Sequence, residues 1–208
     1  MKQIYDMSKV IDLFKDACVE WSGALEDLDR ALVETAVKVC NHDSYIGAGI
    51  ERSAFSFKDF VIKVSKEFYV DINDEIAEDD FNQWCDEENE GKTYYYNCLE
   101  DMEYSKCESE QGLQEIKNYE AVLNSGIEEI QNHFAEIYCC SSNGNIIVME
   151  KCEPAEGVDE ELLSLYDSLY EDIHCDNVGL NKDNRMVVLD LGFAFHWDEI
   201  YRYFGVEV

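Results

Sequence analysis

Asp172, Asn177 and Asp190 have side-chain types and a spacing that suit phosphoryl transfer. Asn177 follows Asp172 by five positions, and Asp190 follows Asn177 by thirteen. Phosphoryl transfer needs a carboxylate that orients the acceptor hydroxyl, and oxygen ligands for a metal ion that bridges the phosphates. We therefore expect Asp172 to act on the acceptor hydroxyl, and we expect Asn177 and Asp190 to bind the metal ion.

The segment between the last two of these residues predicts a hairpin that holds them together. Two short apolar strands are expected at residues 178–180 and 186–189, and a tight turn is expected at residues 182–184. A hairpin of this length returns the chain to its starting point. We therefore expect it to bring Asp190 back to the same metal ion as Asn177.

Upstream elements must support this arrangement. Residues 7–40 show helical periodicity, which predicts two short amphipathic helices. The stretches "SAFSF" and "FVIKV" then predict two strands joined by a tight turn at Lys58-Asp59. Gly47 and Gly49 are expected in a turn that precedes these strands.

The middle of the chain continues with a helix and a second hairpin. Apolar positions between residues 113 and 131 predict one helix. The stretch "HFAEIYCCSSNGNIIVMEKC" predicts two apolar strands across a Ser-Asn-Gly turn. The stretch "EELLSLYDSLY" predicts a further helix that leads into the loop of Asp172. Helices and antiparallel hairpins together predict the α+β class.

These motifs resemble those of the protein-kinase-like superfamily. The pair "DIHCDN" and "VVLDLG" is similar to its catalytic and metal-binding loops, with the same interval of five between Asp and Asn. Upstream and in the right order, "IGAGIERSAF" resembles a shortened Gly-rich loop, and "FVIKV" resembles the strand of the phosphate-pairing lysine. "LQEIKNYEAVL" resembles the helix that carries its glutamate partner, and "IIVMEKCEP" resembles the hinge strand. The resemblance covers about residues 44–196.

The resemblance implies a fold and a domain organisation. It implies a protein-kinase-like bilobal fold with a small antiparallel-sheet N-lobe and a truncated helical C-lobe. Residues 1–43 would form an N-terminal helical extension, and residues 44–208 would form a minimal kinase-like domain. An acidic insertion would occupy about residues 65–112 of that domain.

The resemblance also implies ATP and Mg²⁺ as cofactors and assigns roles to individual residues. The catalytic residues would be Asp172, Lys63 and His174, and the metal ligands would be Asn177 and Asp190. The expected nucleotide-binding residues are Gly47, Gly49, Lys63, Glu120, Met149 and Glu150. The glutamate that pairs with Lys63 has four candidates, with Glu120 preferred and the others being Glu115, Glu75 and Glu78.

Several departures from the family pattern indicate which members of the superfamily the chain resembles. His174 lies two residues after Asp172, as in aminoglycoside- and choline-kinase-like members, while Tyr170 and Glu171 stand where His and Arg are usual. Sixteen residues follow Gly192, and they contain no A-P-E motif of the kind that precedes a peptide-docking subdomain. The chain in this respect is similar to short kinase-like proteins of bacteria and their viruses.

The charge of the chain restricts its partners. Asp and Glu number 47 against 16 Lys and Arg, which gives a net charge of −31. This charge repels nucleic-acid backbones and anionic membranes. It is compatible with a solvated, highly soluble surface or with a surface that attracts a basic protein partner or substrate. Fifteen of the acids lie between Asp71 and Glu110, a stretch that we expect to dock the partner. The alternative to an enzyme is therefore a kinase-like acidic binding protein that inhibits a basic, nucleic-acid-binding partner.

The cysteines and the first residues point to the cytoplasm. The chain has nine cysteines with no C-x-x-C spacing, and "MKQIYDMSKVIDLFKDACVEW" lacks the apolar core of a signal peptide. Zinc is a weak alternative, because His174-Cys175 has no second pair at ligand spacing. We expect free, mostly buried thiols in a reduced protein.

Overall fold

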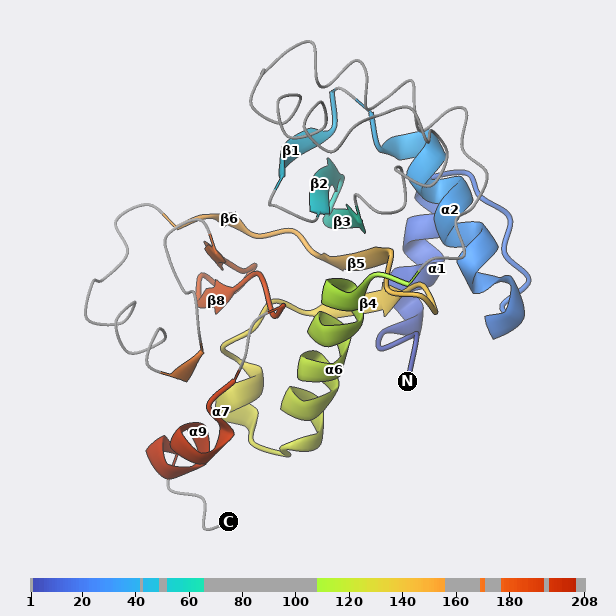
Figure 1. The fold of residues 1–208 in the computed structure, drawn as a ribbon. Coiled ribbons are helices and arrows are strands. Elements are labelled where there is room, and N and C mark those ends of the chain that lie inside the picture. The colour runs from blue at the N-terminus through green and yellow to red at the C-terminus, as the bar shows by residue number, and fades with distance from the viewer. Residues whose placement is uncertain are drawn as a thin grey trace, which may run out of the picture. The chain divides into compact units, whose positions relative to one another are not determined.

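The computed structural model describes seven stretches of the chain, which fall into two compact units. The described residues are 2–41, 43–48, 52–65, 108–155, 169–170, 177–192 and 195–204. The first unit comprises residues 1–113 and 137–151, and the second comprises residues 114–136 and 152–208. Each unit has its own sheet, and the two are described in turn (Figure 1).

Two helices open the first unit, as the periodicity of residues 7–40 predicted. Helix α1 spans Met7–Asp16, and helix α2 spans Leu28–Val39 after a short 3₁₀ turn, η1, at Leu25–Asp27. Asp6 caps α1, because its carboxylate accepts hydrogen bonds from the first free backbone N–H groups of the helix.

The sheet of the first unit has five antiparallel strands in the order β1-β2-β3-β5-β4 (Figure 1). The strands are β1 Tyr45–Ala48, β2 Arg52–Phe57, β3 Phe60–Ser65, β4 Ile137–Cys140 and β5 Ile146–Glu150. The predicted hairpins β2–β3 and β4–β5 are therefore confirmed. Lys58 and Gly144 adopt positive φ angles of 52° and 74° in the two turns, which lets each hairpin reverse tightly.

One face of this sheet and the two helices bury a common apolar core. The helices contribute residues such as Leu13 and Leu32, and the strands contribute residues such as Phe55, Ile62 and Val148. Burial of large side chains from both layers removes apolar area from water, which is the main stabilising contribution to such a unit. Residues 7–40 are thus part of the core that supports β3.

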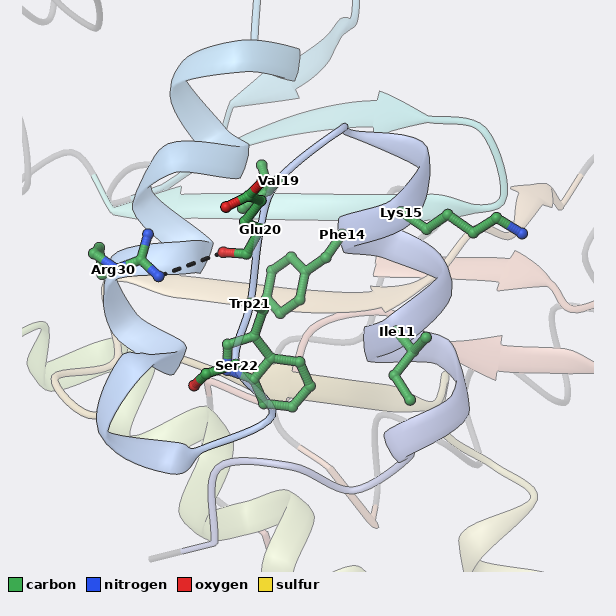
Figure 2. Close-up of a pocket in the computed structure, with 8 residues that line it drawn as sticks. All are labelled: Ile11, Phe14, Lys15, Val19, Glu20, Trp21, Ser22 and Arg30. Atoms are coloured by element: carbon green, nitrogen blue, oxygen red, sulfur yellow. Dashed lines mark hydrogen bonds between the residues drawn. The ribbon is translucent and has the colours of Figure 1, made fainter.

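A hollow of about 610 Å³ opens on the first unit beside α1 and α2. Figure 2 shows Phe14 and Trp21 facing each other there, with ring centroids 5.3 Å apart. Arg30 reaches from α2 to the carbonyl oxygen of Glu20 at 3.4 Å. None of the predicted site residues that the structure describes lines this hollow.

The predicted single helix over residues 113–131 is wrong, because the structure divides it. Helix α6 spans Glu110–Asn124, and a separate short helix, α7, spans Glu128–Gln131. Gly126 lies between them with a φ angle of 67°, a left-handed conformation that ends a helix. The apolar periodicity of the sequence continues across Gly126, so it gave no sign that the helix ends there.

The first turn of α6 lies against the β4–β5 turn. A Cβ atom added to Gly112 would lie 2.1 Å from the carbonyl oxygen of Gly144. The backbone N–H of Ser109 also donates to the carbonyl oxygen of Asn143 at 2.9 Å. Only a residue without a side chain permits this approach of two backbones.

The second unit contains a small sheet and an aromatic cluster. Its strands are β6 Glu153–Pro154, β7 Val178–Leu180 and β8 Met186–Val188, paired antiparallel in the order β6-β7-β8. The predicted β7–β8 hairpin is confirmed to within one residue. Helix α9, Trp197–Tyr203, follows. Phe134, Tyr170 and Phe195 pack together with ring centroids about 5 Å apart.

The fold class is therefore α+β, as predicted, and the structure shows that its larger antiparallel sheet has five strands. The bilobal kinase-like architecture stays a prediction. Among the described residues, no helix is both long and apolar enough to span a membrane. The predicted helix at residues 160–170 and the acidic stretch between Asp71 and Cys107 lie outside the described residues, apart from Leu169 and Tyr170.

Candidate functional site

Lys63 lies in β3, the central strand of the five-stranded sheet. It pairs with Ala54 of β2 on one side and with Ile147 of β5 on the other. Its neighbours Ile62 and Val64 point into the helix-covered core, so Lys63 points to the opposite face of the sheet. The residue is only 9% exposed, and an ammonium group is costly to bury without compensation.

Met149 and Glu150, the predicted hinge residues, end the neighbouring strand β5. Met149 pairs with Val61, so its side chain and that of Lys63 lie on one face of the sheet. Glu150 pairs with Phe60 and belongs to the other face. Both predicted hinge residues are buried, at 2% and 5% exposure.

The predicted turn at Gly47 is wrong, because this glycine lies inside strand β1. The pairing of β1 with β2 shifts register between Tyr45 and Gly47, which indicates a bulge. A Cβ atom at Gly47 would meet no heavy atom of the described residues within 4 Å. Steric crowding therefore does not require glycine there. Gly49, the other predicted phosphate-loop residue, lies outside the described residues.

Helix α6 carries two of the four candidate partners of Lys63. Glu115 is completely buried at 0% exposure, whereas Glu120 is half-buried. Glu115 precedes Ile116 in the buried part of the helix, which also includes Tyr119 and Val122. A buried carboxylate requires hydrogen bonds or a cation, and burial thus distinguishes Glu115 from Glu120, while the partner of Lys63 stays a prediction. Glu75 and Glu78 lie outside the described residues.

Asn177 and Asp190 lie at the same end of the β7–β8 hairpin. The backbone N–H of Leu189 donates to the carbonyl oxygen of Asn177 at 2.8 Å. This bond continues the pairing by one position beyond the Val178–Val188 pair, at the open end of the hairpin. Asp190 is the next residue along the chain. The hairpin thus places the backbones of these two residues, thirteen positions apart in the sequence, at one end, and their role as metal ligands stays a prediction.

The carboxylate of Asp190 is oriented by the turn that follows it. Its Oδ1 atom accepts a hydrogen bond from the backbone N–H of Gly192 at 2.8 Å. The carbonyl oxygen of Leu191, between them, accepts a hydrogen bond from the side chain of Asn118 in α6 at 2.6 Å. Sequence reasoning missed Asn118, because nothing in a helix sequence marks a contact with a residue 73 positions away.

One amide oxygen and one carboxylate form a donor set that fits Mg²⁺. This ion binds proteins through one or two carboxylates and completes its shell with water and phosphate oxygens. Among the described residues, no group of three His, Cys, Asp or Glu side chains could hold a metal ion by itself.

Asp172 and His174 lie outside the described residues, but the residues that flank their loop are described. Tyr170 precedes the loop and is buried at 1% exposure, and Asn177 follows it. The hydroxyl oxygen of Tyr170 lies 3.2 Å from Nδ1 of His133. Burial lowers the pKa of His133 to about 4, so this imidazole is neutral at pH 7.

Comparison with known proteins yields distant likenesses among solved structures, while no established family and no curated protein matches the chain. The bifunctional kinase-methyltransferase WbdD is similar over 76% of this chain and 35% of its own, with a TM-score of 0.36 and 16% identity. The Lpg2603 kinase of Legionella pneumophila, bound to IP6, is similar over 74% and 50%, with a TM-score of 0.32 and 16% identity. The chain thus spans half or less of these two structures. Likenesses of this size carry no argument about activity.

Proposed function

We propose that the chain is an ATP- and magnesium-dependent phosphotransferase whose acceptor is a hydroxyl of a protein or of a small molecule. One observation carries the proposal. The β7–β8 hairpin holds the backbones of Asn177 and Asp190 at one end, and Asn177 follows Asp172 by five positions in the sequence. An amide and two carboxylates, one of them oriented by a backbone N–H group, are the groups that phosphoryl transfer requires.

The proposed reaction assigns one task to each residue. The acceptor hydroxyl oxygen attacks the γ-phosphorus, and the bond from that phosphorus to the β–γ bridging oxygen breaks as ADP leaves. Asp172 orients the acceptor hydroxyl and takes its proton. Asn177 and Asp190 would hold the magnesium ion, which supplies neutralisation of phosphate charge. His174 would brace the loop or contact the substrate.

Lys63 is proposed to bind the phosphates through its ammonium group. The observation that supports this role is a lysine in the middle of an apolar central strand at 9% exposure. Glu120 is proposed as its partner, with Glu115, which is more deeply buried, as the alternative. Gly47, Gly49, Met149 and Glu150 are proposed to contact the nucleotide.

Nucleotide binding is the first test of this function. ATP with Mg²⁺ should stabilise the folded chain by about 2.7 kcal/mol at a concentration one hundred times the Kd, because a ligand stabilises only the state that binds it. This stabilisation is measured as a rise in melting temperature. In Asp190→Asn, most of the part of that rise that depends on magnesium should be lost. Asp183→Asn is the matched control, since Asp183 is an exposed residue of the same hairpin. Equal shifts in the two variants would contradict the role of Asp190.

Transfer of labelled γ-phosphate to candidate acceptor proteins is the second test. The label should be lost in Asp172→Ala and in Lys63→Met. It should remain in Lys58→Met, because the side chain of Lys58 is 53% exposed in the turn before β3. Equal labelling by the wild type and by all three variants would sink the proposal.

A second candidate function follows from the net charge of −31. The chain would bind a basic, nucleic-acid-binding protein in the cytoplasm and inhibit it, with the acidic stretch at about residues 65–112 as the docking element. Binding should weaken steeply as salt increases, because salt screens attraction between exposed charges. It should also survive Asp172→Ala. Transfer activity that requires Asp172, with no salt-sensitive basic partner, would decide against this candidate.

A further inference from the structure

One peptide group next to Asp190 has both of its polar atoms bonded to side chains. This group joins Leu191 to Gly192. Its carbonyl oxygen accepts a hydrogen bond from Nδ2 of Asn118 at 2.6 Å. Its N–H group donates to Oδ1 of Asp190 at 2.8 Å. The orientation of the Asp190 carboxylate is thus linked to Asn118 through a single peptide plane.

Asn118 is itself held in a defined orientation. Its Oδ1 atom accepts a hydrogen bond from Nε2 of Gln114, one helical turn earlier, at 2.9 Å. The amide oxygen is therefore directed to Gln114, and the NH₂ group is directed to Leu191. Asn118 is 6% exposed and Leu191 is fully buried, so water has little access to replace this donor.

Loss of the Asn118 donor would leave a buried carbonyl oxygen without that hydrogen bond, which is costly. The peptide group can escape this cost by rotating about the bonds on either side of it. Gly192 makes such a rotation easy, since glycine has access to backbone conformations that other residues avoid. Rotation of the plane would also turn the N–H group away from Asp190. The carboxylate would then lose the donor that orients it.

We propose that Asn118 is a positioning residue for the metal-binding carboxylate of Asp190 and acts through the Leu191–Gly192 peptide group. The inference rests on the proposed function, in which Asp190 holds magnesium. Asn118 lies three positions after Glu115, so the two buried polar residues of α6 share one side of the helix. A displacement of α6 would therefore disturb the orientation of Asp190 together with the position of Glu115.

The first measurement is made without any ligand. Hydrogen exchange of the Gly192 amide is followed by NMR in protein labelled with ¹⁵N-glycine, which contains only 11 labelled residues. Asn118→Asp keeps the size of the side chain and replaces its donor by an oxygen. The Gly192 amide should exchange at least about 10-fold faster in this variant, because its hydrogen bond to Oδ1 of Asp190 is lost.

A matched control separates this effect from a general effect of added charge. Asn124→Asp adds the same carboxylate at the exposed last residue of α6 and should leave the Gly192 amide unchanged. If Asn118→Asp does not fold, Asn118→Ala compared with Asn124→Ala gives the same information without a new charge. Gln114→Leu should give a smaller effect, because it only frees the orientation of the Asn118 amide.

The second measurement uses Mn²⁺ as the probe, titrated in the presence of ATP and detected by electron paramagnetic resonance. Loss of an outer residue that orients a metal ligand typically weakens metal binding by about 10- to 100-fold. We expect about a 10-fold weaker Mn²⁺ affinity in Asn118→Asp, and no change in Asn124→Asp. The affinity for ATP without metal should be the same in both variants. If Asn118 were needed only for stability, its substitution would weaken the binding of ATP without metal as well.

The outcomes distinguish this inference from the proposed function. A wild-type protein that binds Mn²⁺ with ATP, together with an Asn118 variant that binds them equally well, overturns the inference alone. A Gly192 amide that exchanges at the same rate in both proteins also overturns it. A wild-type protein that binds neither ATP nor Mn²⁺ overturns the proposed function and, with it, the role of Asn118.

Discussion

The two units of the chain fix their candidate residues by different means. Lys63, in the first unit, sits within six consecutive pairings of β2 with β3 and five of β3 with β5. Asp190, in the second unit, lies two residues beyond the three-residue strand β8. Its surroundings are set by hydrogen bonds that involve Asn118 and Gly192.

This difference teaches where each unit is sensitive to substitution. Ladder hydrogen bonds join backbone atoms, so the place of Lys63 hardly depends on which side chains its neighbours carry. A side-chain hydrogen bond is lost with one substitution, and the buried group that it leaves behind is costly. We expect the first unit to fail through backbone crowding or core defects, and the second through single polar changes.

The largest expected effect tests backbone crowding in the first unit. Gly112→Ala would place a Cβ atom 2.1 Å from the carbonyl oxygen of Gly144. Gly144 has a φ angle of 74° in its tight turn, so its backbone has little freedom to move away. We expect a loss of about 3 kcal/mol in the free energy of unfolding, the upper end for overpacking. The gain of about 1 kcal/mol in helix propensity offsets only part of the strain. Urea unfolding followed by circular dichroism measures the loss.

Gly47→Ala is the control for this prediction. No heavy atom of the described residues lies within 4 Å of a Cβ at Gly47. Its effect on unfolding should stay within about 0.5 kcal/mol. If the two variants unfold at the same urea concentration, α6 does not depend on its close approach to the β4–β5 turn, and the contrast between the units is weakened.

The intermediate effect concerns a buried imidazole of the second unit. Burial lowers the pKa of His133 from 6.5 to about 4, so the unfolded chain takes up a proton before the folded one does as pH falls. The stability that His133 contributes is therefore complete above pH 6.5 and is lost as pH falls toward 4. The loss should be on the order of 2 kcal/mol. Urea unfolding at pH 7 and at pH 4.5 measures it.

Two variants show whether burial is the cause. His133→Gln has no group that titrates here, so the wild type should lose more stability than this variant between pH 7 and pH 4.5. Tyr170→Phe removes the hydroxyl that lies 3.2 Å from the imidazole but leaves the residue buried, so it should keep the pH dependence. A pH dependence that disappears in Tyr170→Phe would assign the effect to the hydrogen bond.

The smallest effect tests a surface contact of the first unit. Nζ of Lys58 lies 2.9 Å from Oδ1 of Asp16, with the side chains 53% and 33% exposed. Exposed ion pairs contribute little, so Asp16→Asn should lower the free energy of unfolding by about 0.5 kcal/mol or less. The difference from the wild type should vanish at 1 M salt. A loss above about 2 kcal/mol would mean that side-chain contacts also fix the first unit, which would remove the contrast.

Much of the fold could be predicted from the sequence because its signals are local. The periodicity of residues 7–40 predicted α1 and α2, and the turn residues predicted the hairpins β2–β3, β4–β5 and β7–β8. The break of the helix at Gly126 was missed, because glycine in a helical pattern is compatible with either continuation or termination. Gly47 was misplaced for a related reason, since glycine also occurs at bulges within strands.

The candidate site divides in the same way. Side-chain types and spacing along the sequence proposed Asn177 and Asp190, and the family resemblance proposed Lys63. The predicted hairpin is confirmed and places the backbones of Asn177 and Asp190 at one end, while the roles of all three residues stay predictions. The sequence placed Glu115 and Glu120 on one predicted helix and favoured Glu120 as the partner of Lys63. Burial, which depends on what packs against that helix, distinguishes the two side chains, and the partner of Lys63 stays a prediction.

The sequence by itself determined helices α1 and α2, the three hairpins and the chemistry that its polar residues can support, since each of these depends on neighbours along the chain. Only the tertiary structure decided that Asn118 binds the carbonyl oxygen of Leu191, 73 positions away, and that Gly112 lies against Gly144. Such contacts depend on how separate elements pack. A polar residue in a helix can face water or a buried carbonyl oxygen, and the sequence around it is the same in both cases.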